Sequence, residues 1–89
     1  MSILKAYVVG YGYMGQIRAQ VCINDPRIEL VGVCDSSIQE EISGVEWFED
    51  YEEGLSACKP DLVFICTPNF LIPDYAETAL LKGSHVFCE

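Results

Sequence analysis

The stretch Gly10-Tyr11-Gly12-Tyr13-Met14-Gly15 decides the fold of this chain, because it has the spacing G-x-G-x-x-G between two differently patterned segments. The apolar run over residues 3–9 before it predicts a β-strand, and the segment 13–24 after it predicts a helix. A second apolar run over residues 28–34 ends at Asp35, 20 positions after Gly15. A glycine-rich turn in this context, followed at this distance by an acid, is typical of a dinucleotide-binding βαβ unit.

Each residue of the turn has its own expected role. Gly10 permits the tight turn, Gly12 lets backbone approach a pyrophosphate, and Gly15 lets the helix pack close to the strands. The N–H groups around Tyr13 and Met14 are expected to face the phosphates at the positive end of the helix. The alternative is a tight strand-to-helix turn that binds no ligand.

Asp35 is expected to accept hydrogen bonds from the hydroxyls of an adenosine ribose. Its carboxylate would repel a 2′-phosphate, and no Lys or Arg lies between Arg27 and Lys59 to attract one. The sequence therefore favours NAD over NADP as the cofactor, while Ser36 and Ser37 remain able to hydrogen-bond a phosphate. The alternative for Asp35 is a capping carboxylate at the end of a strand.

The rest of the chain alternates short apolar runs with helical patterns. Further strands are expected at residues 45–48, 62–67 and 85–88, and further helices around residues 51–58 and 73–83. Continuous apolar runs suit parallel strands that are covered on both faces. The alternation predicts an α/β fold of the Rossmann type, a doubly wound parallel sheet with five strands in the order 3-2-1-4-5.

The first helix has an expected apolar face. Met14, Ile17, Val21 and Cys22 recur there at helical spacing. Pro26 ends the helix, because a proline disfavours helical geometry in the residue before it.

A second set of candidate ligand contacts follows the strand expected at residues 62–67. Open parallel sheets bind ligands at the carboxyl ends of their strands, near the switch point between the first and fourth strands. Thr67, Pro68 and Asn69 are therefore expected to contact the cofactor, with Pro68 stiffening the loop. The alternative is turn chemistry alone, in which Asn69 caps the next helix.

Composition excludes several classes of partner. The chain has 89 residues, enough for one domain, and its 14 acids and 5 bases give a net charge of −9 and a pI near 4.3. Nucleic acids and anionic membranes both require clustered Lys and Arg, so neither is an expected partner.

The longest apolar run, residues 62–66, is far shorter than the ~20 residues of a spanning helix, and a cytoplasmic location is expected. Seven of the acids fall within residues 40–53 and predict a solvated face.

The metal-ligating residue types show no site pattern. The cysteines form no C-x-x-C pair, and they are expected to be buried thiols in a reducing compartment: Cys22, Cys34, Cys58, Cys66 and Cys88. The single histidine, His85, begins a strand at the end opposite the expected ligand edge, so a structural or solvent-facing role is expected for it. No metal is predicted.

Four motifs make the sequence similar to the GFO/IDH/MocA family, named for glucose-fructose oxidoreductase and inositol dehydrogenase. They are VVGYGYMG at residues 8–15, VCD at 33–35, PDLVFICTPN at 60–69 and ALLKGSHVFCE at 79–89. The resemblance implies NAD(P)-dependent hydride transfer to or from a sugar, cyclitol or related small hydroxyl compound. It also implies an N-terminal dinucleotide domain, a following substrate domain and a homo-oligomeric parent.

The resemblance extends to Glu89. In the family the fifth strand ends in Glu-Lys-Pro, with the glutamate beside the nicotinamide ribose and the lysine in the catalytic site, and Glu89 matches that glutamate. Two positions depart from the family, since Ile72 and Arg18 stand where many relatives have histidine.

Residues 1–89 are therefore interpreted as the dinucleotide-binding domain of an oxidoreductase, incomplete at its C-terminus and cut before a sixth strand. The chain is expected to bind nucleotide without turnover, and no catalytic residue is predicted within it. Two alternatives stay open. One is a non-catalytic NAD(H)-sensing module, and the other is a structural α/β domain that binds no cofactor.

Overall fold

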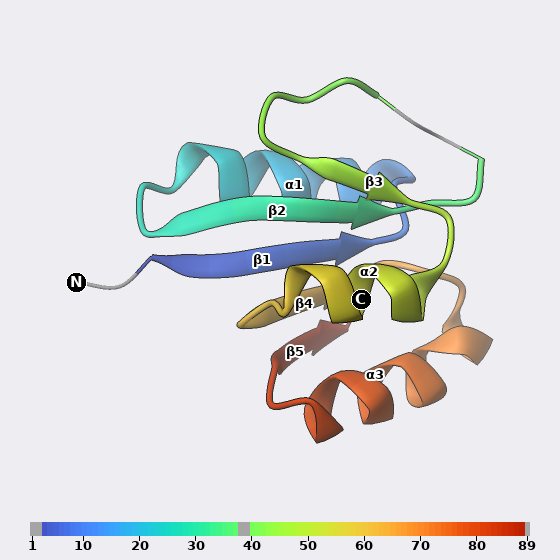
Figure 1. The fold of residues 1–89 in the computed structure, drawn as a ribbon. Helices are drawn as coiled ribbons and strands as arrows, with labels where there is room; N and C mark the ends of the chain where they lie inside the picture. The colour runs from blue at the N-terminus through green and yellow to red at the C-terminus, as the bar shows by residue number, and fades with distance from the viewer. Residues whose placement is uncertain (1–2, 38–39, 89) are drawn as a thin grey trace.

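A single parallel sheet organises the computed structural model, which describes residues 3–37 and 40–88. The strand order in the sheet is β3-β2-β1-β4-β5, and every pairing is parallel, as predicted (Figure 1). In chain order the elements are β1 (Leu4–Val9), α1 (Tyr13–Asn24), β2 (Ile28–Cys34), β3 (Glu46–Phe48), α2 (Tyr51–Cys58), β4 (Leu62–Ile65), the short 3₁₀ helix η1 (Asn69–Leu71), α3 (Ile72–Leu81) and β5 (His85–Cys88).

Helices cover both faces of the sheet, as a doubly wound fold requires. Alternate residues of β1 divide between the two faces. Ala6 and Val8 belong to the core beneath α1, while Tyr7 and Val9 belong to the core beneath α2 and α3. Since β1 is the central strand, its four buried residues tie both layers of the core together.

The apolar face expected for α1 is only partly correct. The helix buries Gly15, Ala19 and Cys22, whereas Ile17 is 37% exposed and Val21 is 52% exposed. Small side chains at the buried positions let the helix approach the sheet closely, so the bulkier residues lie on its outer flank.

A buried tyrosine sets the distance between α2 and the sheet. Tyr7 is fully buried, and its hydroxyl donates a hydrogen bond to the carbonyl of Tyr51 at 3.0 Å. A Cβ on Gly54 would collide with the Tyr7 hydroxyl, and one on Gly32 would lie 3.2 Å from the ring. These two glycines therefore make the space that the Tyr7 side chain occupies.

Three strands are shorter than predicted. β1 begins at Leu4, β3 begins at Glu46, and β4 ends at Ile65. The Cys66 amide still donates to the Val9 carbonyl at 2.8 Å, but the chain then leaves the sheet at Thr67. This departure opens a space beyond the carboxyl end of β1.

The edge strand β5 pairs with β4 alone among the described residues. Phe87 stacks on Phe64 with ring centroids 5.0 Å apart, yet Phe87 remains 49% exposed. His85 is exposed at the start of β5, where the strand pairs with Leu62 at the amino end of β4, as expected. No helix in the described part of the chain is long and apolar enough to cross a membrane.

Candidate nucleotide site

A cavity of about 430 Å³ lies at the carboxyl ends of β1, β2 and β4. Five of the predicted site residues line it, namely Gly10, Gly12, Asp35, Thr67 and Pro68. Tyr13, Met14 and Gly15 form the first turn of α1, directly after Gly12. Residues far apart in the sequence thus meet at the edge where open parallel sheets bind ligands.

The glycine-rich turn is held by contacts that leave no room for side chains at two positions. Gly10 has φ of +92°, its N–H donates to the Cys34 carbonyl at 2.7 Å, and a Cβ there would lie 2.7 Å from the Cys66 carbonyl oxygen. A Cβ on Gly15 would collide with the carbonyl of Gly10. The close approach of α1 to the turn therefore depends on Gly15, which is the packing role expected for it.

Gly12 presents the opposite situation. It is the N-cap residue of α1, makes no side-chain cap, and a Cβ built on it would meet nothing within 4 Å. The N–H groups at the start of a helix have no acceptor within the helix, and they carry the positive end of its dipole. Open space in front of such N–H groups suits a phosphate, and packing does not require the missing side chain at Gly12.

The Asp35 carboxylate lies directly above the turn. Its Oδ2 accepts a hydrogen bond from the Tyr11 amide at 2.7 Å, and its Oδ1 accepts one from the Ser37 amide at 2.8 Å. Ser36 and Ser37 are exposed beside it. The sequence predicted the position of Asp35 at the end of β2 but not its bond to the turn.

The segment after β4 contributes an unusual polar atom. The Oγ1 atom of Thr67 is buried and has no hydrogen-bond partner among the described residues. Pro68 is exposed on the cavity wall, and its carbonyl accepts from the Leu71 amide at 3.0 Å. A buried hydroxyl without a partner is costly, so a ligand group that bonds Thr67 would relieve that cost.

Asn69 is not at the position that the capping alternative requires for α3. It begins η1, and the N-cap residue of α3 is Leu71. Pro73 lies in the first turn of α3, as expected. Glu89 lies outside the described residues, so its predicted role stays a prediction.

Sequence reasoning missed several residues of the cavity wall. Tyr75 reaches it from α3, where its ring stacks on Tyr51 at 4.0 Å and its carbonyl accepts from the Tyr51 hydroxyl at 2.6 Å. Burial raises the pKa of Tyr75 and, more strongly, raises that of Tyr51 to about 12. Both phenols therefore stay protonated at neutral pH. No local pattern could have identified Tyr75, because its place depends on how α3 packs beside α2.

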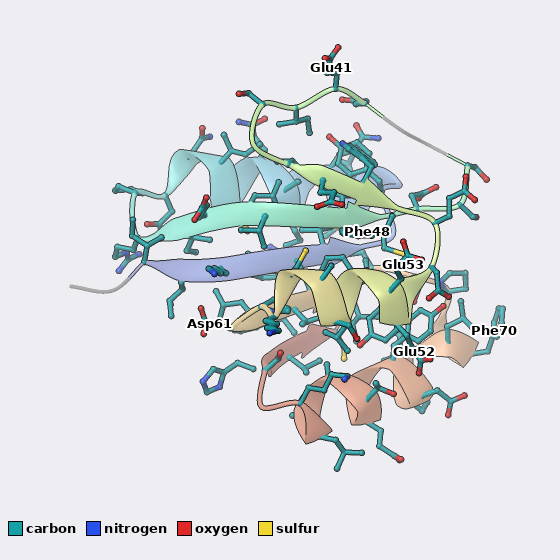
Figure 2. The ribbon with its side chains drawn as sticks, viewed as in Figure 1. Glu41, Phe48, Glu52, Glu53, Asp61 and Phe70 are labelled. Atoms are coloured by element: carbon teal, nitrogen blue, oxygen red, sulfur yellow. The ribbon has the colours of Figure 1, made fainter. Side chains whose placement is uncertain are left out.

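The acidic run borders the cavity without forming a metal site. Glu49 lines the cavity, and the other acids of residues 40–53 are also exposed; Figure 2 shows Glu52 and Glu53 on α2 and Glu41 on the loop before β3. Asp50 has a local role, since its Oδ2 accepts from the Glu53 amide at 2.9 Å and caps α2. No group of three or more His, Cys, Asp or Glu residues in the described ranges is placed to hold a metal ion. The run is a solvated face, as predicted.

The five cysteines form no disulfide among the described residues, but the expectation that all are buried is wrong. Cys22 and Cys34 are buried, Cys58 and Cys66 are half-buried, and Cys88 is exposed at the edge strand β5. Cys34 and Cys66 lie on the cavity wall, on either side of the end of β1. Burial raises the pKa of the Cys22, Cys34 and Cys58 thiols, in the last case to about 11. These three thiols are therefore protonated and unreactive near neutral pH.

The family of the chain follows from comparison with known proteins. Residues 4–89 match the family model described as "Oxidoreductase family, NAD-binding Rossmann fold", and the chain belongs to this family. The resemblance to glucose-fructose oxidoreductase and inositol dehydrogenase is thereby confirmed, as is the Rossmann-type fold.

Individual relatives are similar over nearly the whole chain. D-glucoside 3-dehydrogenase of Escherichia coli K12 is 32% identical over 95 aligned residues, which cover 99% of this chain and 27% of that protein. The structure of scyllo-inositol dehydrogenase from Lactobacillus casei, with bound NAD(H) and scyllo-inositol, superposes with a TM-score of 0.84 at 26% identity. D-galactose-1-dehydrogenase from Rhizobium etli superposes with a TM-score of 0.81 at 27% identity.

Each of the two superpositions covers 98% of this chain and 28% of the other chain. The chain thus spans a little over a quarter of the length of these relatives.

Proposed function

We propose that this chain binds NAD(H), in preference to NADP(H), in the cavity at the carboxyl ends of β1, β2 and β4. The observation that carries the proposal is the pairing of an open glycine turn at the start of α1 with the Asp35 carboxylate, which bonds the amide of Tyr11 within that turn. The turn suits the pyrophosphate and the carboxylate suits ribose hydroxyls. These residues fit the cofactor that the family description names.

Different residues of the chain bind different parts of the cofactor in this proposal. The first-turn N–H groups of Tyr13 and Met14 bind phosphate oxygens, and Gly12 leaves the approach open. Thr67 has the free hydroxyl to bond a further polar group of the ligand. Pro68 and Asn69 complete the loop beside Thr67, and Glu89 is assigned to the nicotinamide ribose by resemblance alone.

The proposed parent reaction is hydride transfer to or from a sugar, cyclitol or related small hydroxyl compound, as the names of the relatives suggest. Bound NAD supplies the nicotinamide ring that accepts or returns the hydride. Residues 1–89 serve as the dinucleotide-binding domain, and the substrate is positioned and deprotonated by groups outside them. We further propose a cytoplasmic location and a homo-oligomeric parent, with no nucleic-acid or membrane partner. The acidic composition supports the last point.

The preference for NAD has a direct test. No Lys or Arg lines the cavity, whereas Asp35 and Glu49 do, so a 2′-phosphate would meet carboxylates only. Calorimetric titration should give tighter binding of NAD(H) than of NADP(H). Asp35→Ala should weaken NAD binding by about 1.5–3 kcal/mol, the range for a hydrogen bond to a charged group. Equal affinity of the unmodified chain for both cofactors would contradict the preference.

A further inference from the structure

The Asp35 carboxylate joins two separate segments of the site. Oδ2 accepts a hydrogen bond from the Tyr11 amide at 2.7 Å, and Oδ1 accepts one from the Ser37 amide at 2.8 Å. Tyr11 lies in the turn before α1, while Ser37 follows β2, and 26 positions separate the two donors along the chain. Bonds of an N–H to a carboxylate are among the stronger hydrogen bonds in proteins, so this bridge constrains the turn as well as the carboxylate.

Tyr11 is fixed on its other sides too. Its carbonyl accepts from the Gln16 side-chain amide at 3.3 Å, and its ring meets Trp47 edge-on with centroids 4.9 Å apart. Its hydroxyl lies 3.5 Å from a Glu40 carboxylate oxygen, and the residue is 6% exposed although it belongs to a loop. Since Tyr11 stands between Gly10 and Gly12, its placement sets the peptide planes that lead into α1.

These contacts point to a second task for Asp35. Resting on the proposed function, we propose that Asp35 is also a positioning residue: through the Tyr11 amide it holds the glycine-rich turn in its phosphate-binding conformation. Recognition of the ribose and recognition of the diphosphate are then coupled through one carboxylate. A ligand that lacks ribose hydroxyls still depends on Asp35.

The two tasks are compatible on the same side chain. Each oxygen of a carboxylate can accept more than one hydrogen bond, so a backbone amide and a ribose hydroxyl can bond the same oxygen. The amides of Tyr11 and Ser37 each donate to one of the two Asp35 oxygens. The bridge also orients the carboxylate, which lines the cavity.

Electrostatics makes the proposal easy to separate from its alternative. If Asp35 only faced the ribose, then removing its negative charge would strengthen binding of an anionic diphosphate that has no ribose hydroxyls. If Asp35 holds the turn, removing its carboxylate weakens that binding, because the turn loses its order and the first-turn N–H groups must be ordered when the diphosphate binds. The signs of the two effects differ.

The test uses 2′,3′-dideoxyadenosine 5′-diphosphate as the probe, with Asp35→Ala and the matched control Glu49→Ala. Both variants remove one carboxylate from the same cavity wall. Among the described residues, the Tyr11 amide of the turn donates to the Asp35 carboxylate, and no hydrogen bond joins the turn to the Glu49 carboxylate. Calorimetry should show that Asp35→Ala binds the probe about threefold or more weakly than the unmodified chain. Glu49→Ala should bind it as tightly or more tightly. Unchanged or tighter binding by Asp35→Ala would overturn the proposal.

Amide hydrogen exchange supplies a readout that needs no ligand. The Tyr11 amide should exchange about tenfold or more faster in Asp35→Ala, as the loss of a charge-assisted bond requires. The β1 amides of Val8 and Val9 report that the chain remains folded, and Asp35→Asn replaces the alanine variant if they lose protection. Equal Tyr11 exchange in variant and unmodified chain refutes the bridge, whereas failure of the unmodified chain to bind NAD refutes the proposed function and leaves the bridge standing.

Discussion

Replacing Gly12 with alanine separates the binding role of the turn from its packing role. The backbone of Gly12 has φ of −78° and ψ of −156°, which alanine adopts readily, and its new Cβ would meet no atom within 4 Å. The cost to folding comes only from alanine being a poorer N-cap than glycine, and it should stay at or below about 1 kcal/mol. The methyl group would, however, occupy the approach to the first-turn N–H groups, so NAD affinity should fall at least about tenfold, or 1.4 kcal/mol.

Gly15→Ala is the matched comparison. Its Cβ would collide with the Gly10 carbonyl, which is backbone and cannot move aside as a flexible side chain would. Overpacking of this kind costs about 1–3 kcal/mol. For a domain of this size each kcal/mol lowers the Tm by about 4–8 °C. Gly15→Ala should therefore lose both stability and NAD binding, while Gly12→Ala loses binding alone.

Thermal unfolding followed by circular dichroism and calorimetric titration with NAD together decide the matter. If Gly12→Ala bound NAD as tightly as the unmodified chain, the pyrophosphate would have to lie elsewhere, and the proposed site would be refuted. A native Tm in Gly15→Ala would refute the packing argument instead.

Three further outcomes follow from the structure. Burial raises the pKa of Tyr7 above its ordinary 10.0, so Tyr7 stays protonated in the folded chain at pH values where it ionises in the unfolded chain. The free energy of unfolding should therefore fall by about 1.4 kcal/mol for each pH unit above about pH 10. Tyr7→Phe should show a shallower decline in denaturant titrations at alkaline pH. The exposed edge of β5 should make the chain associate unless that strand frays; sedimentation as a strict monomer together with slow amide exchange at Val86 and Phe87 would contradict both. The chain alone should not oxidise sugars or cyclitols, because substrate positioning accounts for roughly 7–11 kcal/mol of such catalysis and, under the proposed function, is supplied by groups outside it. Sustained NADH formation, measured by absorbance, would refute this.

The order of the elements and the gathering of the candidate site residues at one edge of the sheet were predictable because both follow from short-range signals. The glycine spacing, the apolar runs and Asp35 at a fixed distance define the βαβ unit, and the parallel sheet follows from chain connectivity. Tyr11 was not predictable in the same way. Its position is a variable one in the motif, and its burial arises from Trp47 and Asp35, which only the folded sheet brings to it.

The buried face of α1 and the space around Tyr7 show a different limit. Hydrophobic periodicity favours large apolar residues as the core face, but the sheet beneath α1 already carries bulky side chains. Small residues, Gly15 and Ala19, therefore face it. Likewise Tyr7 fits because Gly32 and Gly54 lack side chains, and Gly54 lies 47 positions away in the sequence. Such a fit depends on which large side chain faces which small residue, and a single sequence does not reveal which residues face each other.

The charge of the chain sharpens the argument about how an anionic cofactor is recognised. With a net charge of −9 and no Lys or Arg on the cavity wall, the overall field cannot attract a dinucleotide. Attraction must come from the N–H groups at the start of α1, whose effect amounts to about half a charge and fades within a turn. Binding of phosphate is then possible only where the ligand reaches those N–H groups directly. Under the proposed function, an additional phosphate on the ribose would lie beyond their reach and beside Asp35, so the acidic surroundings that weaken attraction at long range are also what we propose to discriminate against NADP.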